Sequence, residues 1–230
     1  MPLTGCLDPG GLPEGVVVGI DVSQSRGLDV AVLDHRLQLA APLRRRVERA
    51  CAVRWVAALS PLAVAVDGPA SWARGPGGRT GERALLGRGI RLFLTPPAAG
   101  ARSAFTRWME EAVALFQALA AVGYRPFQGR TVRGSSLEVF PHATATVLLG
   151  RVAAKAERPA VLRAQGVAVP RGASRDGIDA LLCALTGWWA VAGRFTALGD
   201  ALEGWIVVPG DLKPHYPPRR RPEIPAQSEP

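Results

Sequence analysis

The chain has 230 residues and a net charge of +9, with 48% hydrophobic and 20% charged side chains, so it can bury one sizeable core or two small ones. This composition excludes a wholly disordered chain and a collagen, and no apolar run approaches the ~18 residues of a membrane helix. The first residues lack the basic-then-apolar pattern of a signal peptide, and Cys6, Cys51 and Cys183 lack CxxC spacing. We therefore expect a soluble cytoplasmic protein with reduced thiols, no zinc site and no membrane contact.

Strands and helices alternate along one predicted domain, residues 15–208. The expected elements are strands at 16–22, 28–34, 37–43, 62–68 and 135–141, helices at about 43–59, 103–122 and 175–193, shorter helical pieces over 143–167, and a closing apolar segment at 204–210. Short turns let the first three strands pair antiparallel, whereas the later strands need helical crossovers. The sequence thus predicts an α/β fold with a mixed five-stranded sheet and helices on both faces.

The remaining segments have weaker signals. Residues 1–14 and the Pro/Arg-rich stretch 209–230 are expected to be flexible, and the Arg219–Arg221 cluster in that stretch is either a solvated terminus or a phosphate contact. Ser174 is an expected N-cap for the last helix. The pair Trp188-Trp189 in that helix fits core better than a dimer surface.

Five carboxylates occupy positions where an isolated charge is costly. Asp21 and Asp67 end the first and fourth predicted strands, Glu138 lies within the fifth, and Asp176 and Asp179 share one helix face. Carboxylates that are brought together repel one another, and hard divalent ions such as Mg²⁺ or Mn²⁺ relieve that repulsion. Taken together, these acids favour a metal site of the kind that hydrolyses phosphodiesters with two ions.

Each acid also has a structural explanation. Asp21 can end its strand in an Asx-turn, and Asp67 can shape the turn that follows it. Asp176 can offset the helix dipole, and Glu138 can pair with an arginine. Taken one at a time, these structural explanations are favoured.

The order of the acids resembles the RNase H-like superfamily, which carries one acid on the first strand, one at the end of the fourth and one on the last helix. Asp176-x-x-Asp179 resembles the last-helix motif of its Holliday-junction resolvase branch. The chain is more closely similar to a family of predicted RNase H-like nucleases, domain of unknown function 429. That resemblance runs through GIDVSQSRGLDVAVLD (19–34), AVDGPASW (65–72), GRTGERALLGRGIRLFLTPP (78–97), EVFPHA (138–143), SRDGIDALLCALTGWWA (174–190) and GWIVVP (204–209).

The resemblance implies an RNase H-like fold with a divalent-metal site. Its implied catalytic residues are Asp21, Asp67, Glu138 and Asp179, with Asp21, Asp67, Asp179 and Asp176 as candidate ligands of Mg²⁺ or Mn²⁺. Two loops depart from the family pattern. Gly68 stands where a hydrophobic residue is common, and Thr80-Gly81-Glu82 stands where the family tends to carry Cys-Asp.

The Gly-rich loop after the fourth strand supplies candidate substrate contacts. Arg79 and Arg83 can clamp a phosphate near the metal ions, or Glu82 and Arg83 can form an ion pair that holds the loop. The loop is not a P-loop, because GxxxxGK[ST] is absent. His142 is a third candidate substrate-binding residue, able to orient water or accept a proton, and a partly buried structural histidine is the alternative.

These features favour a Mg²⁺- or Mn²⁺-dependent nuclease that hydrolyses nucleic acid, DNA or RNA. The net charge supports a polyanionic partner, although every basic residue except Lys155 and Lys213 is arginine, a bias that a GC-rich genome also produces. The alternative is a catalytically inactive nucleic-acid-binding or scaffold protein of the same fold. A phosphotransferase of the actin and sugar-kinase class is disfavoured, because GIDVSQSRG is a poor phosphate loop and the chain is short.

Overall fold

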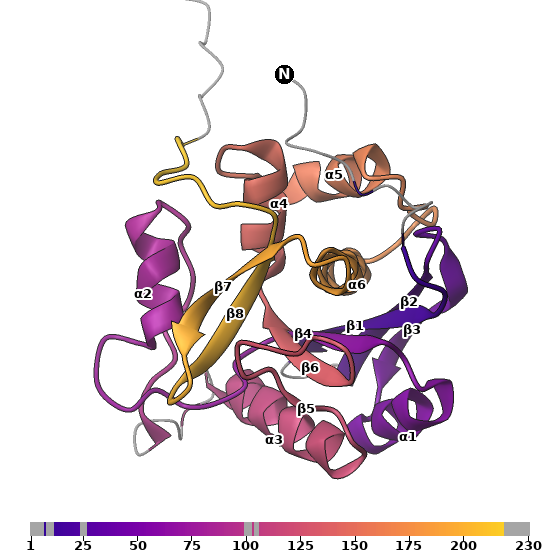
Figure 1. Cartoon of the computed structure of the whole chain (residues 1–230), viewed down its shortest axis with the longest axis horizontal. Coiled ribbons are helices and arrows are strands. Elements are labelled where there is room, and N and C mark those ends of the chain that lie inside the picture. Colours follow the sequence, from indigo (N-terminus) through magenta and orange to yellow (C-terminus); the bar gives the residue numbers. More distant parts are fainter. Residues whose placement is uncertain (1–6, 8–11, 24–26, 99–102, 104–105, 219–230) are drawn as a thin grey trace, which may run out of the picture.

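The computed structural model describes residues 7, 12–23, 27–98, 103 and 106–218. Its centre is one mixed sheet (Figure 1). The strands are β1 (Val16–Ser23), β2 (Gly27–Asp34), β3 (Leu39–Val47), β4 (Ala63–Asp67), β5 (Arg125–Pro126), β6 (Ser135–Val139), β7 (Phe195–Asp200) and β8 (Gly204–Pro209). They follow the order β3-β2-β1-β4-β6-β8-β7 across the sheet, and β5 pairs with β6.

Helices cover both faces of this sheet. They are α1 (Arg49–Leu59), α2 (Thr80–Gly87), α3 (Arg107–Ala121), α4 (Pro141–Leu149), the 3-10 helix η3 (Lys155–Glu157), α5 (Arg158–Ala164) and α6 (Arg175–Val191). In Figure 1, α6 lies on one face with α4 and α5 beyond it, and α1 and α3 lie on the other face. β1, β2 and β3 pair antiparallel, while β4 and β6 are parallel to β1. The predicted α/β fold, a mixed sheet of three antiparallel strands followed by crossover strands with helices on both faces, is therefore confirmed.

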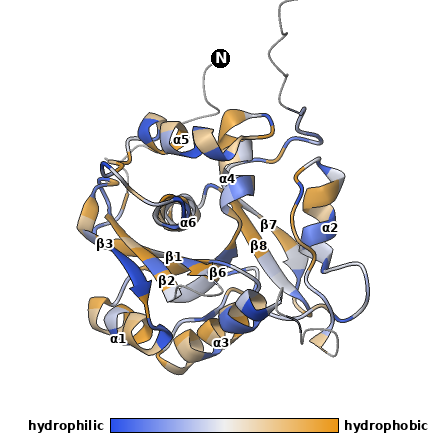
Figure 2. Ribbon diagram, turned by 180° about the vertical axis from the view of Figure 1, so that it is seen from behind, coloured by the Kyte–Doolittle hydropathy of each residue, from blue (hydrophilic) through white to orange (hydrophobic). Residues whose placement is uncertain are grey.

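The central strands form because their residues suit burial on both faces. β1 has the sequence VVVGIDVS, and all of its residues except the two at its ends are buried. β4 has four buried apolar residues before Asp67. Such runs are typical of strands covered by helices on both sides. β3, in contrast, carries Arg44–Arg46 and is hydrophilic at that point (Figure 2), as expected for a strand at the edge of the sheet.

Several predicted boundaries were wrong. The sheet has more than five strands, because β8 adds parallel to β6 and β7 returns antiparallel beside it. β3 extends to Val47, and its helix begins at Arg49 instead of about residue 43, because the polar Arg44–Arg46 stretch continues the ladder with β2. α2 begins within the segment 68–83 that was expected to be a Gly-rich loop, and it continues to Gly87.

The expected N-cap of α6 and the expected burial of its tryptophan pair are both confirmed. The Ser174 side chain accepts a hydrogen bond from the Gly177 backbone N–H at 3.0 Å and caps the helix. Trp188 and Trp189 are buried, and the Trp188 indole N–H donates to the Leu33 carbonyl at 3.1 Å. Among the residues that the structure describes, no helix is long and apolar enough to cross a membrane.

The expected flexible ends are partly packed. Leu7 and Leu12 are buried against the α6 side of the sheet. Tyr216 is 1% exposed, and its backbone N–H donates to the Arg88 carbonyl at 2.9 Å. The chain therefore stays on the body at least to this residue, because burial of the tyrosine ring and a backbone hydrogen bond hold it there. Arg219–Arg221 lie outside the described residues.

Gly19 lets α6 rest directly on the backbone of β1. A Cβ at this position would lie 2.1 Å from the Ala180 carbonyl oxygen and 2.3 Å from the Ala184 nitrogen. We expect Gly19→Ala to lower the free energy of unfolding by at least about 2 kcal/mol, because main-chain atoms cannot move aside as a side chain can. Urea unfolding beside Gly75→Ala, where a Cβ meets nothing within 4 Å, measures this effect. Equal midpoints for the two variants would contradict it.

Candidate metal centre

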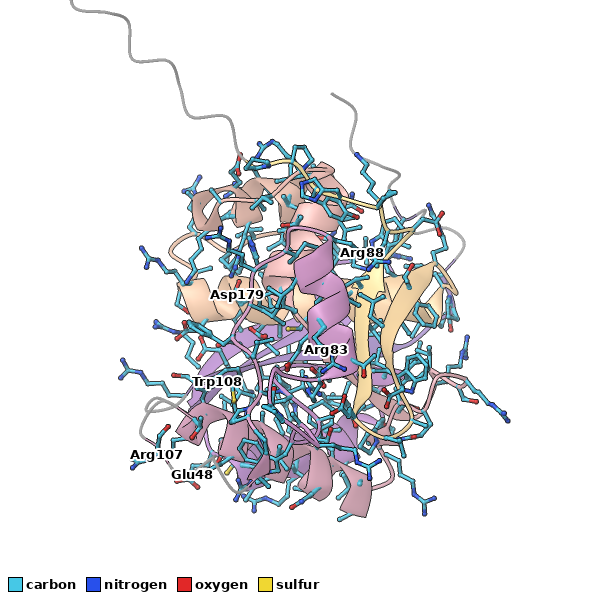
Figure 3. All side chains as sticks on the ribbon, turned by 90° about the vertical axis from the view of Figure 1, so that its left-hand side faces the viewer. Glu48, Arg83, Arg88, Arg107, Trp108 and Asp179 are labelled. Carbon is cyan, nitrogen blue, oxygen red and sulfur yellow. The ribbon has the colours of Figure 1, made fainter. Side chains whose placement is uncertain are left out.

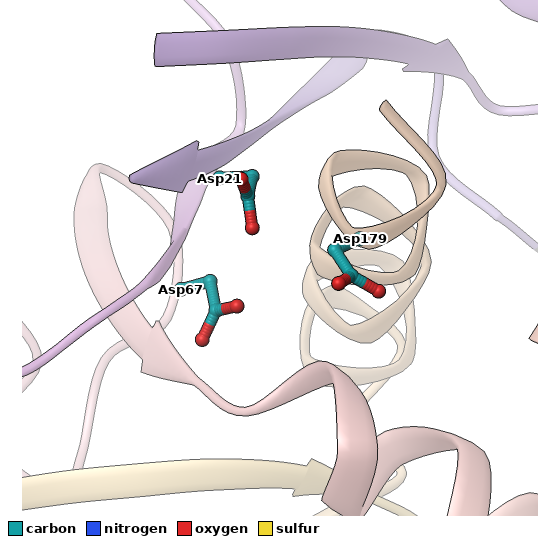
Figure 4. A group of neighbouring side chains, drawn as sticks. All are labelled: Asp21, Asp67 and Asp179. Carbon is teal, nitrogen blue, oxygen red and sulfur yellow. The ribbon is translucent and has the colours of Figure 1, made fainter. Parts of the chain in front are cut away.

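Three aspartates from separate elements meet at one edge of the sheet (Figure 4). Asp21 lies near the end of β1 and Asp67 ends β4, and the parallel ladder sets the two residues side by side. Asp179 comes from the first turns of α6, which crosses β1 at Gly19. One carboxylate oxygen of each aspartate lies within 4.8 Å of the others. The fold therefore brings together three of the predicted site residues.

The three carboxylates cannot all ionise easily without a cation. The pKa of Asp21 is raised above its ordinary value, first by burial and then by repulsion from Asp67, Asp179 and Asp176. Burial and the charge of Asp179 also raise the pKa of Asp67. A hydrogen bond from Asp21 lowers it and so offsets part of that rise. In the metal-free protein Asp21 and Asp67 are therefore expected to share a proton near neutral pH.

Arg158, the first residue of α5, pairs with Asp179. Its Nη1 donates to both carboxylate oxygens of the aspartate, and its side chain is 8% exposed. The guanidinium charge opposes the rise that burial causes in the pKa of Asp179. No sequence pattern indicated this arginine, because it lies 21 residues before its partner in a segment of short helical pieces.

Glu138 lies beside this aspartate cluster but faces an arginine. Its carboxylate accepts hydrogen bonds from both Nη atoms of Arg79, one of them at 2.7 Å, and from the Ala70 backbone N–H at 2.9 Å. Its charge also raises the pKa of Asp67, so it lies near that side chain. It does not belong to the three-aspartate group, because the guanidinium holds its oxygens.

Arg79 is not placed to clamp a phosphate as predicted. It is 3% exposed, and its Nε and Nη2 donate to Glu82 at 3.0 Å while its Nη atoms bind Glu138. The loop is held by an ion pair of Glu82, as one alternative proposed, but the partner is Arg79 instead of Arg83. Arg83 is exposed, and its guanidinium bonds the Gly78 carbonyl and the Thr80 hydroxyl. Figure 3 labels Arg83 on α2 and Asp179 on α6 in one view.

Asp176 and His142 lie at the periphery. Asp176 is half-buried and raises the pKa of Asp21 and of Asp179, although it lies outside the three-aspartate group. His142 lines a different pocket, with His215 among its walls. Burial and the nearby charges of Arg158 and Lys155 lower the pKa of His142 to about 4, so the imidazole is neutral at pH 7 and a weak base.

Asp29 is a buried acid that the sequence patterns did not single out. It pairs with Asp21 across the β1–β2 ladder, and its carboxylate accepts hydrogen bonds from the Ser174 hydroxyl at 3.0 Å and the Arg46 N–H at 3.1 Å. Because Ser174 caps α6, Asp29 fixes the end of the helix that carries Asp179. Its position in an alternating strand, among apolar neighbours, was the only available signal.

Comparison with known proteins identifies the family. A model of the family described as "Protein of unknown function (DUF429)" matches residues 19–203. The chain belongs to this family. It is similar to the solved structure of Thermus thermophilus RuvC, with 20% identity, coverage of 77% of this chain and 96% of that chain, and a TM-score of 0.46. For T. thermophilus RuvC in complex with Holliday junction substrate the identity is 18%, the coverage 78% and 96%, and the TM-score 0.44. No curated protein matches the chain.

The donor set of this DUF429 protein suits a hard divalent cation. The three grouped residues offer carboxylate oxygens, which Mg²⁺ and Mn²⁺ prefer, and the group contains neither the histidine nor the thiolate that is common at zinc. Burial first, and repulsion between neighbouring acids second, raise the pKa of Asp21 and Asp67, and burial raises that of Asp179 against the charge of Arg158, so a further positive charge would favour the ionised forms. A bound cation would supply that charge.

Proposed function

We propose that this protein is a Mg²⁺- or Mn²⁺-dependent nuclease that hydrolyses phosphodiester bonds of nucleic acid. The observation that carries the proposal is the three-aspartate group, with one oxygen from each side chain within 4.8 Å of the others at the end of parallel strands. The three aspartates would hold the metal ions, with Asp21, which interacts with both other acids, as the ligand common to the ions and Asp67 and Asp179 as the remaining ligands. The ions would activate water and stabilise the leaving oxygen.

The surrounding residues receive supporting roles. Glu138 lies near Asp67 and is held by Arg79 and the Ala70 N–H, so we assign it to position water beside the metal ligands. Asp176 adds negative charge near Asp21 that favours cation binding. Arg158 would have to share Asp179 with an ion, and its charge would then be available to the substrate.

Nucleic acid is the proposed substrate because of charge. The chain carries a net charge of +9, and 26 of its 28 basic residues are arginines, whose planar guanidinium groups bind phosphate oxygens two at a time. Arg83 is exposed on α2, where its guanidinium contacts the Gly78 carbonyl and the Thr80 hydroxyl, and it remains a proposed phosphate contact.

Calorimetric titration of Mn²⁺ tests the metal site. We expect micromolar binding to the wild type, none to Asp21→Asn, and wild-type binding to Asp211→Asn, which removes an equally charged but exposed carboxylate. Cleavage of labelled DNA and RNA oligonucleotides with Mg²⁺ or Mn²⁺, and its loss in EDTA, tests the activity.

Two results would overturn the nuclease assignment. Absence of binding heat in the wild type would leave the aspartates with a structural role. Salt-dependent oligonucleotide binding without metal-stimulated cleavage would favour the non-catalytic scaffold.

A further inference from the structure

A pocket of about 620 Å³ adjoins the three-aspartate group on the side of α5 and α6. Its walls come from η3, the start of α5 and the first turns of α6. The charged and hydroxyl residues that line it are Lys155, Arg158, Ser174, Arg175, Asp176 and Asp179. Because Asp179 belongs both to this pocket and to the aspartate group, the pocket opens directly beside the candidate metal centre.

Lys155 and Arg175 of this pocket are available for a ligand, and so is the Nε donor of Arg158, whose Nη1 pairs with Asp179. Lys155 and Arg175 are exposed and form no ion pair within the described part of the chain. Arg158 is 7% exposed, and its Nε is a buried donor without a hydrogen-bond partner among the described residues. A buried unpaired donor is costly unless a ligand or water satisfies it.

Three cations and two acids line the pocket, so its charged side chains carry a net positive charge. Lys155 and Arg158 together lower the pKa of His142, which lies on the neighbouring helix α4. The two acids, Asp176 and Asp179, lie on α6, and Asp179 already pairs with Arg158. A divalent ion bound to Asp179 would neutralise that aspartate and leave the three cations in excess.

We propose that this pocket binds a backbone phosphate of the nucleic acid, adjacent to the phosphodiester held at the aspartates. Lys155 and Arg175 contact its oxygens from the rim, and Arg158 contacts it from the floor. This inference rests on the proposed nuclease function, which it deepens by stating where the strand leaves the metal centre. It also predicts that metal binding and substrate binding strengthen each other, because the ion releases Arg158 from Asp179.

Fluorescence anisotropy of labelled single-stranded DNA and RNA oligonucleotides tests the pocket, in EDTA so that nothing is cleaved. Lys155→Ala and Arg175→Ala should each weaken binding roughly threefold to tenfold and reduce the slope of log K against log[salt] by about 0.7, the value for one lost phosphate contact on a single strand. Arg163→Ala is the matched control, because Arg163 is exposed on α5 but does not line the pocket. It should change affinity less than about twofold.

Mn²⁺ titration of each variant separates this inference from the nuclease proposal. Wild-type Mn²⁺ binding and cleavage, with unchanged oligonucleotide affinity in Lys155→Ala/Arg175→Ala, would overturn the pocket and leave the nuclease intact. Weakened oligonucleotide binding in that double variant, with no Mn²⁺ binding in the wild type, would support the pocket and overturn the nuclease. Tight binding of inorganic phosphate without any oligonucleotide binding would assign the pocket to a free anion and overturn the inference.

Discussion

The Asp21→Asn variant is expected to lose roughly a thousandfold or more of the metal-dependent hydrolysis and yet to be more stable than the wild type when no metal is present. Both effects follow from one cause. Asp21 is 8% exposed and is repelled by Asp67 and Asp179, so the charge that would hold a cation is a burden without one. An amide removes the charge and retains hydrogen-bonding capacity, which should raise the free energy of unfolding by about 1–3 kcal/mol.

The stability difference should grow with pH. Because the folded-state pKa values of Asp21 and Asp67 lie above those of the unfolded chain, the native state binds more protons. The free energy of unfolding contributed by this pair is therefore lost as pH rises above the ordinary carboxyl range near 4, and the loss continues through neutral pH. Asp21→Asn should flatten this decline.

Urea unfolding in EDTA at pH 5, 7 and 8.5 measures both quantities, and single-turnover cleavage with Mn²⁺ measures the first. Asp211→Asn should behave as the wild type in all of these experiments, because its carboxylate is exposed. An Asp21→Asn protein that is less stable than the wild type at pH 8.5 without metal would show that the carboxylate has a structural role. Retained cleavage in the variant would remove Asp21 from the catalytic site.

Arg79→Met is expected to destabilise the protein by about 3–5 kcal/mol, the range for breaking a buried ion pair from one side. The guanidinium is 3% exposed and lies between Glu82 and Glu138, which are 2% and 5% exposed. Without it, two buried carboxylates on different elements would face each other with no counter-charge. The link between α2 and β6 would be lost with it.

A second substitution makes the explanation specific. Adding Glu138→Gln to Arg79→Met should recover part of the loss, because it removes one of the two unpaired charges. Arg83→Met, four residues later and exposed on α2, should cost no more than about 0.5 kcal/mol. A loss of equal size in Arg79→Met and Arg83→Met would contradict a role for the buried network.

The parts of the fold that could be predicted are those with local signals. The β-branched run of β1 and the apolar residues before Asp67 indicated buried strands, and a short turn indicated the first hairpin. Two acids at strand ends, followed by one on a helix with a Ser174 cap, then predicted the three-aspartate group. The environment of these strand, strand-end and cap residues can be predicted because it depends on their immediate neighbours in the chain.

The parts that were missed depend on partners far away in the sequence. Glu138 was predicted as a catalytic residue, with an arginine pair as the alternative, and only the folded chain identifies that arginine as Arg79, 59 residues earlier. Nothing in the sequence distinguishes Arg158 from the other arginines, and its role follows only from the packing of α5 beside Asp179. Asp29 needed the cap of α6 as a partner. Ion pairs and hydrogen bonds between residues far apart in the sequence produce no periodic pattern from which they could be predicted.

The direct packing of α6 on the backbone of β1 at Gly19 limits which substitutions this site can accept during evolution. Two residues beyond the contact lies Asp21, and Asp179 immediately precedes Ala180, whose carbonyl makes the contact. The spacing of these two carboxylates is therefore set by main chain against main chain, with no side chain acting as a spacer between them. Substitutions that change the size of apolar residues elsewhere in the core can therefore leave the distance between the two acids unchanged. A side chain at position 19 would push α6 away from β1 and so separate the two acids.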